Sequence, residues 1–496
     1  MKKTLLFTLL LNSFWMFSQV NIDWQKSYGG TWDEYSKGVE VLSDGSYIIG
    51  CVSSSSDGDV LYPYEPDDFW VIKMDEFGEI VWQKCYGGSS ADRLNDIKKT
   101  NDNGFILAGL SFSSDIDVSA NYGVYDGWIV KIDSLGNIEW EKNYGGSGMD
   151  EIRSINLTND GGYIACGYTN STDGDVSYTN GYSDAWVIKI DSVGNLISSK
   201  VFGGPSADGD IANCILQTKD NGYIFIGNSS SEGGDVTSNN GELDLWIVKL
   251  TAIGIIDWQV SLGGSTTELG KSICEGVEDG FYVAGITYSD DFDVSNSHGS
   301  EDGWIINISA TGDTVWTKTY GGSGDDEISS IKRLSNGQII TAGNSQGDCW
   351  MQRLDVEGNI LWEDYYGGSE GEWMNDVEEI ETGYIVTGAS RSIDLDCSEN
   401  NGGCDAWTIK LGDPIITVPE NFRLNNINFY PNPASKIIYF NTEKEVSIKL
   451  TDLTGKQISF VNSNKLDVSN FEPGIYIIAV YDMKGNFLMT QKLVIK

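Results

Sequence analysis

The sequence predicts an all-β protein: a seven-bladed β-propeller with four-stranded blades, followed by a small immunoglobulin-like β-sandwich. A large apolar residue followed by Gly-Gly occurs seven times, at intervals of 58, 58, 58, 60, 58 and 46 residues. Each repeat contains four apolar segments separated by turn residues. A fixed period of this length indicates a repeat architecture, and four short strands per unit are typical of a propeller blade. The landmarks are Tyr28, Tyr86, Tyr144, Phe202, Leu262, Tyr320 and Tyr366.

The third repeat illustrates the expected blade. The first strand is predicted at residues 152–157, and Asn-Asp-Gly-Gly at residues 159–162 turns the chain into a second strand at 163–168. A long polar loop leads to a third strand at residues 186–190. After the turn at residues 191–194, an outer strand completes the unit.

The residue types fit these positions. We expect the innermost strand to carry small or short polar residues ten places after each landmark: Gly38, Asp96, Ser154, Ala212, Ser272, Ser330 and Asp376. One Trp column begins the third strand, at Trp70, Trp128, Trp186, Trp246, Trp304, Trp350 and Trp407. A second lies on the outer strand, at Trp24, Trp82, Trp140, Trp258, Trp316 and Trp362. Each buried aromatic ring removes roughly 150–250 Å² from water, so both columns are interpreted as core rather than as a sugar platform.

The two ends of the repeat array predict how the ring closes. The seventh repeat lacks an outer strand after Trp407, whereas residues 22–26 before the first landmark have the outer-strand pattern and no preceding blade. We therefore expect the N-terminal strand to complete the last blade.

The hairpin before the outer strand resembles a known blade-locking motif. The spacing of Asp133, Gly136 and Trp140 is similar to the tryptophan-docking motif of quinoprotein-type propellers, with one residue fewer between Asp and Gly. This resemblance implies contact between neighbouring blades. No quinone cofactor is expected, because the sequence offers no candidate site for one.

The N-terminus and the charge distribution limit the function. Lys2 and Lys3 precede an apolar run, which predicts a secretory signal peptide at residues 1–18 that exports the chain to the periplasm. No other stretch has the length of a transmembrane helix. Residues 19–412 contain 65 acidic and 21 basic side chains, so nucleic acid is not an expected partner.

Acidic residues recur at three places on one expected face of the propeller. A carboxylate follows each landmark by six residues, at Glu34, Asp92, Asp150, Asp208, Glu268, Asp326 and Glu372. Oxygen ligands at short spacing suit Ca²⁺, whereas Asp side chains that bind loop backbone would produce the same pattern without a metal. Both interpretations are kept. The candidate calcium ligands are Asp57, Asp59, Asp68, Asp115, Asp117, Asp126, Asp173, Asp175 and Asp184.

Signals for catalysis are weak. The only histidine, His298, lies in a polar loop, and no nucleophile elbow or dinucleotide fingerprint occurs. Paired carboxylates could serve a glycoside hydrolase, but nearly all of them repeat around the ring. The irregular places are the sixth repeat, with its shortened loop, and the seventh, with Glu370, Glu372 and Trp373. Among the eight cysteines, Cys397 and Cys404 share one predicted loop of an exported chain, so a disulfide is expected there.

The C-terminal segment resembles a secretion signal. After the propeller at residues 20–413 and a linker at residues 414–424, residues 425–496 contain alternating strands and several short motifs in order. They are similar to the type A C-terminal sorting domain of type IX secretion substrates. The matching residues are Tyr430, Pro431, Asn432, Pro433, Gly455, Gly474, Tyr476 and Lys496.

This resemblance implies recognition by the type IX translocon and its sortase. It also implies an extracellular location or attachment to the outer-membrane surface. Together these observations predict an exported propeller that binds a surface glycan or a protein, with no catalytic residue or certain cofactor. The competing hypothesis is a polysaccharide-active enzyme on the same scaffold.

Overall fold

The computed structural model contains strands and turns and no helix in the part of the chain that it describes. The described residues are 20–61, 63, 67–205, 209–397, 399–412, 429–440, 442, 446–451, 457–481 and 487–496. The predicted signal peptide and linker lie outside them. The chain divides into two compact units, Met1–Pro414 and Ile415–Lys496.

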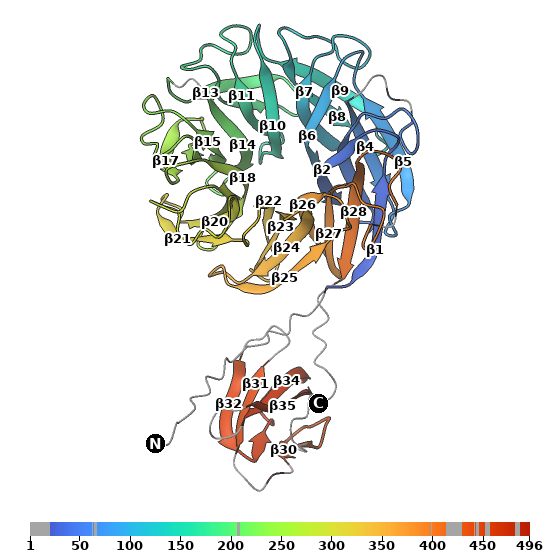
Figure 1. Cartoon of the computed structure of the whole chain (residues 1–496), viewed down its shortest axis with the longest axis vertical. Helices are drawn as coiled ribbons and strands as arrows, with labels where there is room; N and C mark the ends of the chain where they lie inside the picture. The colour runs from blue at the N-terminus through green and yellow to red at the C-terminus, as the bar shows by residue number, and fades with distance from the viewer. Residues whose placement is uncertain are drawn as a thin grey trace, which may run out of the picture. The chain divides into compact units, whose positions relative to one another are not determined.

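The first unit consists of seven four-stranded antiparallel sheets arranged in a ring (Figure 1). Blades 1 to 3 are β2 (Glu34–Val41), β3 (Tyr47–Ser53), β4 (Asp68–Met74) and β5 (Ile80–Tyr86); β6 (Asp92–Lys99), β7 (Phe105–Ser111), β8 (Asp126–Ile132) and β9 (Ile138–Tyr144); and β10 (Asp150–Leu157), β11 (Tyr163–Thr169), β12 (Asp184–Ile190) and β13 (Leu196–Phe202).

Blades 4 to 6 continue in the same order. They are β14 (Asp210–Gln217), β15 (Tyr223–Ser229), β16 (Asp244–Leu250) and β17 (Ile256–Leu262); β18 (Glu268–Glu275), β19 (Phe281–Thr287), β20 (Asp302–Ile308) and β21 (Thr314–Tyr320); and β22 (Asp326–Arg333), β23 (Ile339–Ser345), β24 (Asp348–Leu354) and β25 (Ile360–Tyr366).

Blade 7 confirms the predicted closure. It combines β26 (Glu372–Ile380), β27 (Gly383–Ser390) and β28 (Asp405–Gly412) with the N-terminal β1 (Ile22–Tyr28). The β1–β28 register extends from Ile22 opposite Leu411 to Tyr28 opposite Ala406. First and last strands therefore share one sheet, as Figure 1 shows, and the ring has no open end between blades 7 and 1.

The third-strand Trp column forms the core between blades. All seven of its side chains are at most 2% exposed. The outer-strand column lies at the blade junctions: Gly78 sits so close to Trp24 that a Cβ there would be 2.9 Å from the ring. The Trp24 indole nitrogen also donates to the Glu76 carbonyl oxygen at 3.0 Å. Trp82, Trp140, Trp258 and Trp316 lie in the same way against a glycine of the next blade's hairpin, as the motif implied.

The landmark tyrosines lock the same junctions. The Tyr28 hydroxyl donates to the Gly78 carbonyl at 2.6 Å, and Tyr86, Tyr144 and Tyr320 repeat this bond at 2.6–2.7 Å. Phe202 and Leu262 have no hydroxyl, so these two junctions lack the bond.

The second unit is a two-sheet sandwich. One sheet has the order β29 (Phe429–Tyr430), β30 (Ile437–Phe440), β33 (Lys465–Asp467). The other has the order β32 (Gln457–Ser463), β31 (Val446–Thr451), β34 (Gly474–Tyr481), β35 (Phe487–Ile495). Alternate residues of both sheets, including Phe440, Ile448 and Leu493, form one apolar cluster.

Candidate functional site

The Gly-Gly landmarks lie between buried carboxylates. A Cβ on Gly29 would stand 2.5 Å from both Asp405 Oδ1 and Glu34 Oε2. Glu34 accepts bonds from Gly30 N at 2.8 Å and from the Ser53 hydroxyl at 2.8 Å, so its carboxylate is fixed in place. Glycine is therefore required because the backbone passes too close to two acids for any side chain, a stricter reason than flexibility at a blade crossing.

The predicted calcium ligands bind backbone N–H groups. Asp57 accepts from Thr31 N at 2.7 Å, and Asp115 and Asp173 accept from the equivalent Ser89 and Ser147 at 2.8 and 2.7 Å. Asp59, Asp117 and Asp175 accept from the first glycine of each landmark at 3.2–3.5 Å. Asp126 and Asp184 accept from Tyr122 N and Asn180 N, both at 2.5 Å, and Asp68 is buried.

The contacts of Asp57, Asp59 and their equivalents join each long loop to the Gly-Gly connection that enters its blade from the preceding one, whereas those of Asp126 and Asp184 lie within the loop. In the part of the chain that the structure describes, no group of three or more His, Cys, Asp or Glu side chains is placed to hold a metal ion. Calcium binding by these loops therefore stays a prediction. Backbone hydrogen bonding accounts for one oxygen of Asp126 and of Asp184, whereas Oδ1 of each is buried and accepts no hydrogen bond.

Blade 4 requires a correction of the sequence alignment. Its inner strand begins at Asp210, which accepts from Gly204 N at 2.8 Å and from the Ser231 hydroxyl at 2.8 Å, as the first acid does in other blades. The predicted residue Asp208 lies outside the described residues. Likewise Cys214, not Ala212, follows the bulge in the register. The two extra residues of this repeat therefore lie between landmark and strand.

The predicted disulfide is absent from the structure, where Cys397 and Cys404 are both free and buried. Cys397 accepts from the Ser390 hydroxyl at 3.2 Å and belongs to the apolar cluster that contains Cys349. Cys404 forms a backbone β-bridge with Asp33, where blade 7 meets blade 1. The two thiols therefore occupy separate contacts although they are close in sequence.

A central channel is the main cavity of the propeller. It encloses about 700 Å³ and is lined by side chains from the inner strands of all seven blades. Its walls are mostly polar or charged, which the sequence analysis did not predict. Because every blade contributes to it, this channel is the one place where small differences between repeats meet.

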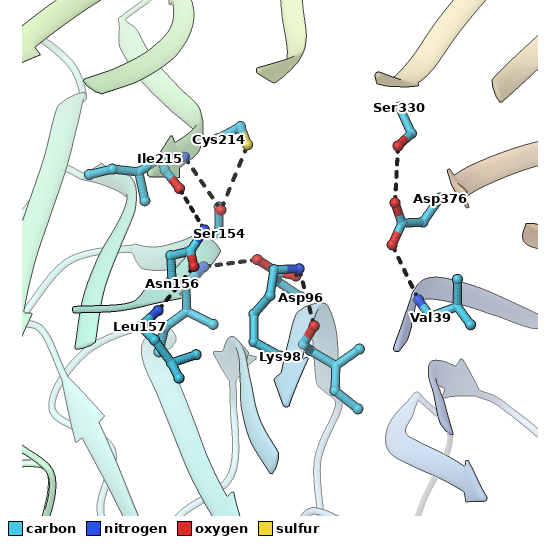
Figure 2. Close-up of polar contacts among 12 residues, drawn as sticks. Val39, Asp96, Lys98, Ser154, Asn156, Leu157, Cys214, Ile215, Ser330 and Asp376 are labelled. Carbon is cyan, nitrogen blue, oxygen red and sulfur yellow. Dashed lines mark hydrogen bonds and ion pairs between the residues drawn. The ribbon is translucent and has the colours of Figure 1, made fainter. Parts of the chain in front are cut away.

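One ring of channel residues is structural. Each inner strand has a bulge, and at several junctions a side chain of this ring accepts from a backbone N–H of the next blade at that level. Asp96 accepts from Ile155 N at 2.9 Å, and Asp376 accepts from Val39 N at 3.2 Å and from the Ser330 hydroxyl at 3.0 Å (Figure 2). The column thus lies at the centre, as predicted, and it also joins neighbouring blades there.

A second ring contains only hydrogen-bond donors and amides. It occupies the fourth residue of each inner strand and is here called the cation belt: Lys37, Asn95, Arg153, Asn213, Lys271, Ser329 and Asn375. All seven line the channel. No carboxylate occurs in the cation belt, although acidic residues outnumber basic ones by 73 to 32 in the whole chain.

Two of the three cations of the belt pair with acids, and the third does not. Arg153 lies 3.3 Å from Glu151, and Lys271 lies 2.9 Å from Glu327. Lys37 forms no ion pair with any residue that the structure describes, and its ammonium lies 5.3 Å from the centre of the Tyr35 ring. Burial lowers the pKa of Lys37, as do Arg153, Lys271 and Arg93, while Glu151 opposes them.

The hairpin end of the channel is acidic. Lys98 pairs with Asp96 at 2.7 Å, and Lys332 pairs with Asp376 at 3.4 Å and with Glu378. Burial raises the pKa of Glu40, which faces this cluster, to about 7. The channel therefore has a cationic middle and an acidic end.

The sequence held a signal for the cation belt that the repeat alignment did not use. The belt position follows the landmark by nine residues in six repeats and by eleven in blade 4. The residue type at this position varies between repeats, so no sequence motif marks it. The informative feature is that acids are missing from this column of an acidic chain.

The residues considered for catalysis have structural surroundings. Glu372 is buried and accepts from Gly368 N at 2.8 Å and from the Ser390 hydroxyl at 2.9 Å, so it repeats the role of Glu34. His298 Nδ1 lies 3.8 Å from Asp302, in a loop. Neither residue lines the channel.

The sorting motif converges on the last strand of the second unit. Asn432 accepts from Val494 N at 2.9 Å and donates to the Lys492 carbonyl at 2.7 Å. Tyr476 donates to the Glu472 carbonyl at 2.8 Å, and Lys496 N donates to Ala434 at 2.8 Å. Gly474 pairs with Ile495 of the last strand. Tyr430 is exposed, Pro431 and Pro433 flank Asn432, and Gly455 lies outside the described residues.

Comparisons with known proteins gave a family match for the C-terminal segment and several similar solved structures. Residues 428–496 match the secretion system C-terminal sorting domain. The Pan2 WD40 domain of Neurospora crassa is 9% identical, with a TM-score of 0.46 over 79% of this chain and 96% of that one. The Dos1 propeller is 12% identical, with a TM-score of 0.42 over 95% of each chain. The comparison with curated proteins gave no match.

These findings define an exported all-β protein with a repeated propeller. Residues 428–496 are a type IX secretion sorting domain, which directs export to the cell surface or the extracellular space. The strand topology carries the assignment of the propeller. Among the described residues, no helix is long and apolar enough to cross a membrane.

Proposed function

We propose that this protein is an exported binding propeller whose central channel holds a ligand without transforming it. After the signal peptide has led it to the periplasm, the type IX translocon recognises the sorting domain and the sortase removes it. The propeller then acts outside the cell, either released or attached to the surface, with a glycan or a protein as the ligand.

The observation that carries this proposal is the composition of the channel. All seven blades contribute side chains to a cavity of about 700 Å³, a size typical of small-molecule sites. The recurring carboxylates outside it are occupied by backbone and hydroxyl donors, as Glu34, Asp150 and Glu372 are. They are unavailable as acid–base pairs, which supports binding over hydrolysis.

The test uses the full-length mature protein on a glycan array, together with a reducing-sugar release assay on the same glycans. We expect saturable binding without sugar release. Release that is abolished by Glu151→Gln or Glu327→Gln, both in the channel, would establish the polysaccharide-active enzyme instead. Glu372→Gln is unsuitable as a probe, because it would disturb the landmark of blade 7.

A further inference from the structure

The cation belt differs from a merely structural ring in its unsatisfied charge. Three cations project from alternate blades 1, 3 and 5, and amides from blades 2 and 4 separate them. Only Arg153 and Lys271 have carboxylate partners, whereas Lys37 has an aromatic ring. Lys37 is half-buried, and a cation that is partly removed from water without an ion-pair partner is stabilised by a bound anion.

Two of the three belt cations lie beside aromatic rings. The Lys37 ammonium lies 5.3 Å from the centre of the Tyr35 ring, and the Arg153 guanidinium lies 5.2 Å from the centre of the Tyr168 ring. Both rings are half-buried and neither lines the cavity, so they border the belt rather than form the channel wall.

The amides complete a set of groups suited to sugar hydroxyls. Asn213 accepts from Arg153 at 2.7 Å and donates to the Gly270 carbonyl at 2.7 Å, while Asn375 donates to the Ser36 carbonyl at 2.7 Å. Asn213 also donates to Asn228 Oδ1 at 3.1 Å, which uses both of its N–H groups, so it offers acceptor capacity to the cavity that it lines, whereas Asn375 has a second N–H group and its oxygen. Amide donors and acceptors suit sugar hydroxyls, and a cation suits a carboxylate on the sugar.

We propose that the channel binds a short acidic oligosaccharide, whose uronate carboxylate lies at Lys37 within the cation belt. This inference rests on the proposed binding function and names its ligand class. The net charge of −41 repels a long polyanion that approaches the surface. One or two carboxylates inside the channel are screened by salt from most of these surface charges. The occupant is therefore a short sugar rather than a nucleic acid or an anionic polymer.

The experiment measures binding of digalacturonate and trigalacturonate to the full-length mature protein by titration calorimetry. Maltotriose serves as the neutral sugar and triglutamate as the acidic peptide. We expect trigalacturonate to bind at least tenfold more tightly than maltotriose or triglutamate. Lys37→Met should weaken trigalacturonate binding tenfold or more, because a charge-assisted hydrogen bond is lost, and Lys37→Arg should restore part of it.

Lys200→Met is the matched control, because Lys200 is an exposed lysine on the outer strand of blade 3. It should leave binding unchanged, and melting curves of all variants check that they fold. Equal binding of maltotriose that Lys37→Met leaves unchanged would overturn the acidic ligand but keep the channel as a sugar site. Tighter binding of triglutamate would also overturn it. If none of these probes and no arrayed glycan binds, the acidic-sugar inference fails together with the glycan form of the proposed function, and a protein is left as the ligand.

Discussion

At the scale of single residues, the landmark glycines show how close approach constrains a sequence. Gly29 lies between Asp405 and Glu34, which are both fully buried. Asp405 accepts from Asn401 N at 2.7 Å, so it cannot move aside without losing a bond. The same arrangement recurs at Gly145 with Asp126 and Asp150.

Gly29→Ala should therefore destabilise the propeller by about 2–3 kcal/mol, the upper range for overpacking a filled site. Gly371 belongs to the equivalent connection of blade 7, but a Cβ there would meet nothing within 4 Å. Gly371→Ala should leave the denaturation midpoint almost unchanged. Urea denaturation followed by Trp fluorescence measures both, and equal midpoints would contradict the steric explanation.

At this scale, a residue's place in the blade is predictable from the sequence where the same residue type recurs in every repeat. It is not predictable where an insertion shifts the count from the landmark. The Trp column at the third strand was predicted residue by residue, because each ring fills the same space in its blade. In blade 4, counting from Phe202 selected Ala212, whereas the bulge in the register places Cys214 at the channel. The cation belt was not predicted, because its seven positions hold different residue types and come together only when the blades close into a ring.

At the scale of elements, β1 closes the ring. It supplies Gln25, which accepts from the Trp407 indole at 2.8 Å, and Lys26, which pairs with Glu79 of blade 1 at 3.0 Å. Trp24 docks on the next hairpin, and the buried Val20 packs against the core of blades 6 and 7. Removal of this strand leaves β28 as an exposed edge, which favours pairing with other chains.

Deletion of residues 20–27 from the otherwise complete mature chain should lower Tm by roughly 10 °C or more and promote association. Light scattering and calorimetry measure these effects. A synthetic peptide of residues 20–27 should partly restore Tm, which separates loss of closure from general misfolding. An unchanged Tm in the deleted chain would show that β1 does not hold the ring together.

At the scale of the whole molecule, buried acids at the blade junctions couple stability to pH. Burial raises the pKa of Asp126, Asp184 and Asp244 to about 6 and that of Asp405 to about 7, and neighbouring acids add to the shift. In the unfolded chain these groups titrate near pH 4. Between about pH 4 and pH 7 the folded protein therefore binds more protons, and this contribution to stability is lost as pH rises.

Other carboxylates act in the opposite direction at lower pH. Asp102, Asp160 and Asp220 lie near Lys131, Lys189 and Lys249 and accept hydrogen bonds, and their pKa values are lowered to about 2. Their contribution is present above about pH 4 and is lost as pH falls toward 2. The two groups of acids together place maximal stability near pH 4–5, below the neutral range.

We therefore expect Tm to be about 5 °C or more higher at pH 5 than at pH 8, measured by calorimetry. Self-repulsion of a chain with net charge −41 acts in the same direction, so the scan is repeated in 0.5 M NaCl, which screens surface charges but not buried ones. Asp405→Asn keeps the shape of the side chain and removes one titrating group, so it should reduce the difference between the two pH values.

Calcium would compete with protons for the same junction carboxylates. Measuring Tm at both pH values with added Ca²⁺ therefore tests whether the loops bind the ion. If the loops hold the ion, added Ca²⁺ should raise Tm at pH 8 and flatten the pH dependence, and EDTA should reverse both effects. If Ca²⁺ and EDTA leave Tm unchanged at both pH values, backbone N–H groups and protons alone satisfy these acids. A Tm that does not fall from pH 5 to pH 8 in high salt would contradict the burial of charged carboxylates at the junctions, because their protonation could not then differ between the folded and unfolded states.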